Sequence, residues 1–276
     1  MARQRLGQHF LADAGWREEI ARAIRISPDA IAPAPPGNAP GFCWIEIGAG
    51  HGEMTEQLAS TGAAVYAIEL DAQFVNRLQR LAKRFANLTI VAGDVLKTDI
   101  AQLAQGRRVR IYGNLPYYIT SPILHHLFAS AELIDEIHIV VQLEVAQRLA
   151  APPGNRDYGY LSVLTQYFAR PELVLKIPGS AFAPPPEVGS ALVTLRFPRA
   201  SAKLPQVDSG RFLEFVKLCF SQKRKILVNN LKSCVNPESA RVALSRLKLR
   251  TDSRAEQLSV ADLASLFEEL APKAES

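Results

Sequence analysis

Residues 111–118 form the run Ile111-Tyr112-Gly113-Asn114-Leu115-Pro116-Tyr117-Tyr118, whose residue types can hold a planar ligand that carries an amine. A strand entering this run must stop near its proline, because proline cannot donate a ladder hydrogen bond and keeps the preceding residue extended. The Asn114 amide then projects from a rigid turn close to aromatic rings, an arrangement that suits a nucleobase. The alternative is a plain strand-to-loop turn whose tyrosines cover the core, and the run alone does not separate the two.

A glycine-rich turn, Gly48-Ala49-Gly50-His51-Gly52, follows an apolar run and precedes a helical pattern over 53–60. Glycines let a ligand approach the backbone and a helix start offers free N–H groups, so this turn predicts a nucleotide or phosphate cradle. The third glycine comes one residue earlier than in the G-x-G-x-x-G dinucleotide motif. This spacing, with Glu46 two residues before the first glycine, favours S-adenosylmethionine (SAM) over NAD or FAD. A turn without any ligand is the remaining alternative.

Polar residues also end the strand-like runs that come next along the chain. Glu69 stands 21 residues after Gly48, where an acid can accept the hydroxyls of a ribose. Asp94 ends the third run and can accept from an adenine amine or cap the following segment, and Asn114 ends the fourth. The carboxyl ends of parallel strands form the ligand crevice of open α/β sheets, so we expect the four residues to lie together. The four runs cover 42–47, 65–68, 88–91 and 109–112.

The alternation of strand and helix patterns predicts an α/β fold, with a domain boundary near residue 200. The loop 182–188 contains three prolines, which stiffen it and hold Phe182 in place. Only helical patterns follow the polar linker 198–209. We therefore expect a domain over 1–200 and a smaller helical domain over 201–276. The later elements are expected as helices over 71–85, 121–128, 143–150, 211–220, 226–231 and 261–270, a further helix starting near 158, and strands over 137–141, 173–177 and 191–197.

The composition is that of a soluble globular protein, at 48% apolar and 21% charged residues. No apolar run approaches the roughly 20 residues that span a bilayer, and the N-terminal residues lack the apolar core of a signal peptide. The three cysteines form no C-x-x-C pair, which indicates free thiols in a reducing compartment, and no metal site is suggested. We expect a cytoplasmic protein with no membrane partner.

Positive charge is concentrated near the C-terminus. Residues 209–254 contain eleven Lys or Arg against three acids, a balance of +8, whereas residues 255–276 carry one Lys against five acids, a balance of −4. A basic block of this density on a small helical segment points to a polyanion such as nucleic acid. The alternative is a solvated face without a ligand.

Nine short motifs, in their order along the chain, resemble those of the bacterial small-subunit rRNA adenine N6-dimethyltransferases. The resemblance runs from about residue 4 to about residue 235, and the ordered set is specific although each motif is weak alone. The motifs are Gln8-His9-Phe10-Leu11, residues 46–52, Ile68-Glu69-Leu70-Asp71, Gly93-Asp94, Asn114-Leu115-Pro116-Tyr117, residues 142–149, residues 158–162, Phe182-Ala183-Pro184-Pro185-Pro186 and Lys223-Arg224-Lys225.

The resemblance implies a Rossmann-like class I SAM-dependent methyltransferase domain, with a mostly parallel seven-stranded sheet and a smaller all-helical C-terminal domain. Such an enzyme dimethylates N6 of two adjacent adenosines in the 3′-terminal hairpin of 16S rRNA, with SAM as methyl donor and no metal. Its partner is 16S rRNA in the immature small ribosomal subunit, and the chain is expected to be a monomer. The alternatives are a 23S rRNA enzyme of the macrolide-resistance type, a DNA adenine N6-methyltransferase, and a SAM-binding assembly factor with minor catalysis.

Residue roles carried over from the family define the candidate site. The cofactor-binding residues are His9, Leu11, Gly48, Glu69, Asp94 and Asn114; the catalytic residues are Asn114, Leu115, Pro116, Tyr117 and Phe182; and the RNA-binding residues are Lys223, Arg224 and Lys225. In this interpretation Tyr117 and Phe182 stack on the two faces of the base. The chain departs from the usual family pattern at His9, Tyr118 and Gly189.

Overall fold

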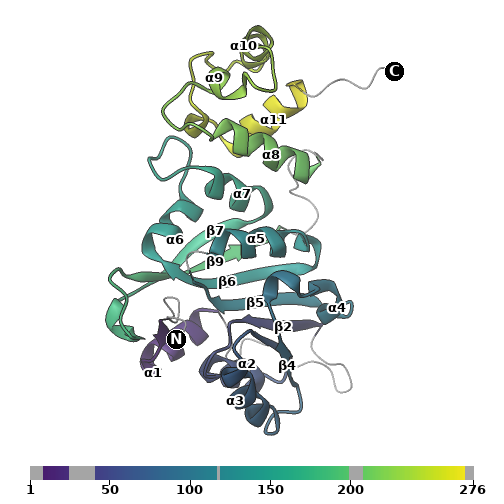
Figure 1. Cartoon of the computed structure of the whole chain (residues 1–276), viewed down its shortest axis with the longest axis vertical. Helices are drawn as coiled ribbons and strands as arrows, with labels where there is room; N and C mark the ends of the chain where they lie inside the picture. Colours follow the sequence, from purple (N-terminus) through teal and green to yellow (C-terminus); the bar gives the residue numbers. More distant parts are fainter. Residues whose placement is uncertain (1–8, 25–40, 117–118, 199–207, 271–276) are drawn as a thin grey trace, which may run out of the picture. The chain divides into compact units, whose positions relative to one another are not determined.

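The structure is a computed structural model that describes residues 9–24, 41–116, 119–198 and 208–270. The chain forms two compact units (Figure 1). The first comprises Met1–Ala146 with Arg170–Phe197, and the second comprises Gln147–Ala169 with Pro198–Ser276. Within the described ranges, the helices are all too short or too polar to cross a bilayer.

The first unit is built on a seven-stranded sheet in the order β4-β3-β2-β5-β6-β9-β7. Strand β9 is antiparallel to both of its neighbours, and the strands from β4 to β6 are parallel, which confirms the predicted mostly parallel sheet. The strands are β2 (Phe42–Ile47), β3 (Ala64–Glu69), β4 (Leu88–Ala92), β5 (Arg108–Asn114), β6 (Ile134–Gln142), β7 (Arg170–Ile177) and β9 (Ser190–Arg196), with β1 (Phe10–Leu11) and β8 (Phe182–Ala183) pairing separately.

The helices of this unit pack on both faces of the sheet. One core joins α1, α2 and α3 to inward residues of the central strands, including Trp44, Tyr112 and Leu192. Helices α4 and α5 lie over the opposite face (Figure 1), as right-handed crossovers require when the chain reverses direction across a sheet. The helical segments are α1 (Ala14–Ala23), α2 (Glu53–Ser60), α3 (Ala72–Ala82), η2 (Val95–Lys97), α4 (Ile100–Ala104), α5 (Thr120–Phe128), η4 (Ala131–Leu133), α6 (Leu143–Ala150), which continues into the second unit, and η5 (Gly179–Ala181).

Local sequence signals account for these elements. Helix α3 begins after Asp71, which is its N-cap: the Asp71 carboxylate accepts the Gln73 N–H at 2.8 Å. Its buried residues Phe74, Val75 and Leu78 fall on one stripe at helical spacing. The central strands are apolar on both faces because helices cover both, as in other parallel sheets.

The strand order reverses between β2 and β5. From β2 the chain passes outward to β3 and β4, then returns to place β5 on the other side of β2. Ligand crevices of open α/β sheets form at such a reversal, beyond the carboxyl ends of the strands. The segments that leave these two ends are the glycine-rich turn after Ile47 and the turn that begins at Asn114.

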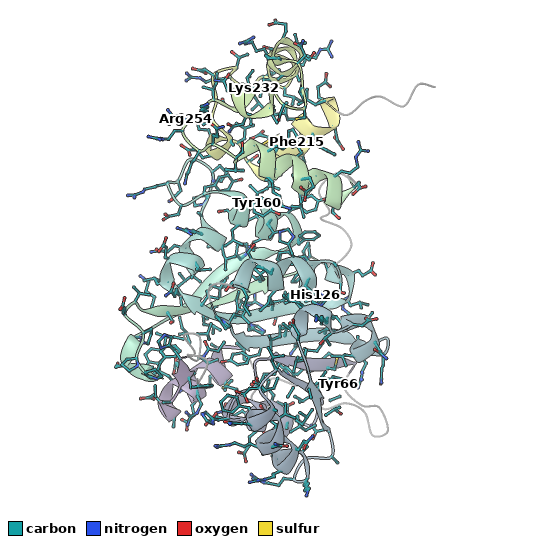
Figure 2. All side chains as sticks on the ribbon, in the orientation of Figure 1. Tyr66, His126, Tyr160, Phe215, Lys232 and Arg254 are labelled. Atoms are coloured by element: carbon teal, nitrogen blue, oxygen red, sulfur yellow. The ribbon has the colours of Figure 1, made fainter. Side chains whose placement is uncertain are left out.

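The second unit is helical in its described residues, and its part after residue 200 agrees with the predicted helical C-terminal part. Phe212, Phe215, Phe267 and Tyr167 form its aromatic core, with ring centroids 4.8–5.9 Å apart. Figure 2 shows Phe215 on α8, facing the interior of this unit. Its elements are α7 (Tyr160–Phe168), α8 (Ser209–Cys219), α9 (Leu227–Leu231), α10 (Pro237–Arg246), η6 (Ala255–Gln257) and α11 (Val260–Leu270).

Candidate active site

A cleft at the carboxyl ends of the parallel strands brings most of the predicted site residues together. Its lining includes His9, Gly48, Glu69, Asp94, Asn114, Leu115, Pro116 and Phe182. Tyr117 and Tyr118 lie outside the described residues. Leu11 is not part of the lining: its side chain is buried in the core shared with α1 and α2. Any role of Leu11 toward a cofactor is therefore one for its backbone.

The glycine-rich turn leaves room for a ligand against the backbone. Gly48 has φ +70°, and a Cβ at this position would meet nothing within 4 Å, so the cleft is open at its Cα. Gly52, the N-cap of α2, has φ +90°, and a Cβ there would lie 3.0 Å from Leu78 Cδ2. Glycine is the residue that adopts such positive φ without strain. The first of these glycines therefore serves the cleft, and the other serves helix packing.

Glu69 is buried and held by the backbone around it. Its Oε2 accepts the Gly50 N–H at 2.8 Å, and its Oε1 accepts the N–H groups of Leu70 and Asp71 at 2.8 and 2.9 Å. A carboxylate offers about four acceptor positions, so about one remains for a ligand hydroxyl. Accepting both ribose hydroxyls, as predicted from the sequence, would require one backbone donor to be shared or released.

Asp94 both caps a helix and lines the cleft, so its capping role does not remove it from the candidate site. Its Oδ1 accepts the Leu96 N–H at 3.0 Å and begins the short helix η2. Helix α5 supports this segment through His126, labelled in Figure 2, whose Nε2 lies 2.9 Å from the Thr98 carbonyl. A carbonyl only accepts, so this nitrogen carries the proton.

Asn114 is fixed in one orientation by the N-terminal segment. Its Nδ2 donates to the His9 carbonyl at 2.9 Å. Because a carbonyl cannot donate, the amide nitrogen must be the atom that faces it, and Oδ1 is left as an acceptor. The Leu115 N–H donates to the Val140 carbonyl at 3.0 Å, which fixes the start of the turn against β6.

The small sheet β1–β8 places two of the predicted residues, His9 and Phe182, at the rim of the cleft. Leu11 pairs with Phe182, and Phe10 with Ala183. The His9 ring Nδ1 lies 2.7 Å from the Pro184 carbonyl, so His9 joins the N-terminal segment to the proline-rich loop. Phe182 is buried and lines the cleft. This pairing brings the N-terminal motif and the 182–186 motif to one place.

A buried carboxyl group lies behind the glycine-rich turn. Glu46 is 3% exposed, and burial raises its pKa to about 8, an effect that nearby Thr55 opposes and the charges of Glu53 and Glu69 reinforce. Its Oε2 and the Thr55 hydroxyl have no hydrogen-bond partner within the described part of the chain. Burial and the Glu46 charge together raise the pKa of neighbouring Tyr112. Because burial raises its own pKa to about 8, Glu46 is mostly protonated at neutral pH.

Sequence reasoning assigned no role to two polar residues of the cleft, Gln142 and Ser190. Gln142 opens one of the family motifs quoted above, and that position was the available signal. Ser190 reaches the cleft because it pairs with Gln142 across β6 and β9. A contact between residues so far apart in sequence has no local signature.

The basic block of residues 209–254 includes cations that form ion pairs and cations that are exposed on a turn. Four of its eleven cations lie in ion pairs, namely Lys217–Glu214, Arg241–Glu238, Arg246–Glu269 and Arg250–Asp252. Lys232 and Arg254, labelled in Figure 2, are also exposed. The predicted triplet 223–225 is exposed on the turn between α8 and α9. Three of the acidic partners are already counted in the balance of +8, and the pair with Glu269 lowers the positive charge available to a polyanion by one more.

Two contacts fix the turn that carries this triplet. The Lys223 ammonium donates to the Arg156 carbonyl within the same unit. Asn230 is buried and donates through Nδ2 to the carbonyls of Cys219 and Gln222, at 2.6 and 3.2 Å. The triplet is thus presented on a backbone anchored at both sides.

The cleft residues fit SAM. The open backbone at Gly48 admits a ligand, Glu69 retains an acceptor position for a ribose hydroxyl, and Asp94 faces the same cleft. Asn114 lies in the same lining with its Oδ1 directed away from His9. A nucleoside part can therefore bind along β2–β4, with its far end toward Asn114.

Comparison with known proteins points to one family. A family model described as ribosomal RNA adenine dimethylase matches residues 1–272. A ribosomal RNA small subunit methyltransferase A from Acidobacterium capsulatum is 39% identical over 268 residues, covering 96% of this chain and 90% of the relative. One from Burkholderia sp. is 44% identical over 236 residues, covering 83% and 79%.

Two solved structures share the fold. A dimethyladenosine transferase from Plasmodium falciparum superposes with TM-score 0.77 at 23% identity, covering 95% of this chain and 97% of that one. The 23S rRNA methyltransferase ErmE gives 0.68 at 24% identity, covering 95% and 100%. At these identities the structures show the fold, whereas the family match and the bacterial relatives carry the assignment. This chain belongs to the ribosomal RNA adenine dimethylase family.

Proposed function

We propose that this protein transfers methyl groups from SAM to N6 of two adjacent adenosines in the 3′-terminal hairpin of 16S rRNA. The observation that carries this proposal is the fixed Asn114 amide, with its acceptor oxygen free for a substrate in the cleft that Gly48, Glu69 and Asp94 also line. The family match and the bacterial relatives named ribosomal RNA small subunit methyltransferase A support the 16S rRNA substrate.

The chain's part in the chemistry is to position a weak nucleophile. SAM, when bound, supplies an electrophilic methyl group. The adenine amine is a poor nucleophile because its lone pair is delocalised into the ring. Asn114 Oδ1 and the Leu115 carbonyl each accept one N–H of the amine, which favours a geometry with the lone pair directed at the methyl group. The methylated nitrogen is cationic and then releases one N–H proton to water, so no general base is required.

Phe182 and Tyr117 hold the plane of the base in this proposal. The target adenosine must leave its stack to reach the cleft. Phe182 is buried at the rim and offers one aromatic face. Tyr117, assigned from the family motif, offers the other, and Pro116 in the lining shapes the turn that carries it.

A labelling experiment tests the substrate. Unmethylated 30S and 50S subunits are incubated with the protein and tritiated SAM, and their RNA is digested to nucleosides. We expect N6,N6-dimethyladenosine from the 30S subunit alone. Label in the 50S subunit would favour the resistance-type enzyme instead, and binding to 30S without label would favour the assembly factor.

Gly113 is expected to be sensitive to substitution because the β5 turn is tightly packed. A Cβ at Gly113 would lie 2.9 Å from Leu115 Cδ2 and 3.2 Å from the Ile47 carbonyl oxygen. We expect Gly113→Ala to displace Leu115 and lower kcat/KM by about 10–100-fold, with a loss of about 1–3 kcal/mol in unfolding free energy. Methylation kinetics and urea unfolding measure the two effects. Gly41→Ala is the matched control, since a Cβ there meets nothing within 4 Å; equal behaviour of the two variants would contradict the packing argument.

We further propose that the helical residues after 200 hold the rRNA backbone, while residues 1–200 carry the methyl transfer. Lys223, Arg224 and Lys225 are the leading phosphate contacts, because they are exposed together on one anchored turn. The partner is 16S rRNA in the immature small subunit, bound by a monomer in the cytoplasm.

Replacing all three of these residues by alanine is expected to weaken binding to immature 30S subunits and to flatten its salt dependence. Each lost phosphate contact lowers the slope of log K against log salt by roughly one. Filter binding between 50 and 200 mM salt measures both. Arg241, Arg246 and Arg250 replaced together by alanine are the matched control, because each of these arginines already pairs with an acid. Equal losses in the two triple variants would show that charge count matters rather than position.

A further inference from the structure

Besides Asn114 and His9, whose ring lies against the Pro184 carbonyl, the half of the cleft that would receive the target base has two polar side chains in its described lining. These are Gln142, at the end of β6, and Ser190, at the start of β9. The rest of that half is apolar or proline, with Pro116, Ile119 and Phe182 as examples. Two polar groups in an apolar pocket are the usual means by which a site fixes the orientation of its ligand.

The sheet register places Gln142 close to Asn114. Asn114 is aligned with Val140 in the parallel pair β5–β6, and Gln142 is two residues further along β6. Side chains two residues apart on a strand share a face, so Asn114, Val140 and Gln142 lie on the same side of the sheet. Ser190 is the antiparallel partner of Gln142 and joins them on that side. Gln142 therefore stands on the strand next to Asn114, at the same edge.

The Gln142 amide is available to a ligand. Its side chain is half-buried and makes no hydrogen bond to the described part of the chain, whereas the Asn114 amide is already fixed by His9. Ser190 is 8% exposed and has a short side chain. Gln142 has the greater reach into the cleft, and its amide carries two N–H donors and one acceptor.

The adenine amine is flanked by two ring nitrogens, N1 and N7, which are both acceptors. The groups proposed to hold the amine, Asn114 Oδ1 and the Leu115 carbonyl, are acceptors and cannot bind either nitrogen. A donor beside them is needed to do so. We propose that the Gln142 side-chain amide donates to a ring nitrogen that flanks the target amine, and that Gln142 thereby fixes the base in the plane where N6 meets the methyl group.

This role rests on the proposed function, and it makes Gln142 a substrate-reading residue of the same site. A base that presents an N–H at the corresponding ring position, as guanine does at N1, would leave two donors facing each other. Unpaired polar groups in a closed site reject such a base. Adenine recognition would then come from Gln142 and Asn114 acting together.

The test combines a protein change with single-atom changes in the substrate. Small subunits are reconstituted with 16S rRNA whose two target adenosines are replaced by 1-deazaadenosine or by 7-deazaadenosine, and single-turnover methylation is measured. For the wild type we expect a rate about 10-fold lower on the analogue that lacks the accepted nitrogen. Gln142→Met keeps the length and removes the donor. This variant should be about 10-fold slower on adenosine and lose that extra analogue effect.

Each protein is characterised by the ratio of its rate on adenosine to its rate on the analogue. A change in the intrinsic reactivity of the analogue amine alters this ratio equally for the wild type and for Gln142→Met, so it cancels when the two ratios are compared. Gln147→Met, at an exposed glutamine on α6, is the matched control and should keep the wild-type pattern. SAM binding by Gln142→Met, measured by calorimetry, should stay within about twofold of wild type if the variant is folded.

The proposal would be overturned if both analogues slowed the wild type and Gln142→Met by equal factors. It would also be overturned if the extra slowing by one analogue persisted in Gln142→Met and disappeared in Ser190→Ala. A merely structural Gln142 would lower all rates alike. Wild-type inactivity on unmodified subunits is a separate result, which would remove the proposed function and the Gln142 role with it.

Discussion

Replacing Asn114 by alanine is expected to lower kcat for methyl transfer by about 10²–10³-fold or more, the range seen when one preorganised polar group is removed from an active site. The variant loses the Oδ1 acceptor for the amine. It also loses the Nδ2 donor that ties β5 to the His9 carbonyl at 2.9 Å. SAM affinity should fall only modestly, because Gly48, Glu69 and Asp94 remain in place. Stopped-assay kinetics on unmethylated 30S subunits and calorimetry with SAM measure the two quantities.

Asn114→Asp separates the two functions of this amide. An aspartate keeps an acceptor oxygen but turns a second oxygen toward the His9 carbonyl, where two acceptors repel each other. We expect this variant to retain more activity than Asn114→Ala but to bind SAM less well than Asn114→Ala, because the repulsion pushes the His9 segment away from the rim of the cleft, whereas alanine only removes the hydrogen bond. Near-normal turnover in Asn114→Ala would remove this residue from the mechanism.

The sequence allowed the site to be predicted where local patterns coincide with a general rule of topology. Gly48, Glu69, Asp94 and Asn114 each end a recognisable strand, and parallel strands present these ends at one edge. Their meeting in one cleft follows from that rule. The helical second unit was predictable for a similar reason, because helical spacing persists there without strand patterns.

Long-range contacts account for what the sequence did not reveal. Strands β1 and β8 have two residues each, too few for any periodicity, yet their pairing brings His9 and Phe182 to the cleft. One of the three backbone donors on Glu69, the Gly50 N–H, depends on how the glycine-rich turn folds back over it. Helix α10 is a different case: Asn236 as N-cap and Pro237 in the first turn are local signals that sequence analysis could have used.

Some sequence predictions remain predictions. The division of roles at residue 200 rests on the change to helical patterns and on the basic block, and the stacking role of Tyr117 rests on the family resemblance. The phosphate contacts of 223–225 depend on the binding experiment above. The ion pairs of Arg241, Arg246 and Arg250 show why charge counting alone was insufficient, since a cation next to an acid is partly neutralised.

The stability of the first unit is expected to fall as pH rises from about 5 to 8, and Glu46→Gln should remove much of that fall. Glu46 is buried behind the glycine-rich turn, with a pKa raised to about 8 chiefly by burial. An unfolded glutamate titrates near pH 4.3. Between these values the folded chain keeps a proton that the unfolded chain has released. The contribution of Glu46 to stability is therefore complete below about pH 4.3 and is lost as pH approaches 8.

The expected slope is about 1.4 kcal/mol per pH unit within this window, on the order of a few kcal/mol in total. Glutamine keeps the shape and the neutral form, so it should match the wild type near pH 5 and exceed it near pH 8. Urea unfolding followed by tryptophan fluorescence reports this unit, because Trp16 and Trp44 both belong to it. Glu18→Gln, at an exposed position on α1, is the matched control and should keep the wild-type slope. Other titrating groups contribute equally to wild type and variant, so the difference between the two curves isolates Glu46. Parallel curves of unfolding free energy against pH for the wild type and Glu46→Gln would contradict the prediction. They would mean that water or a rearranged turn solvates the Glu46 carboxylate in the folded chain.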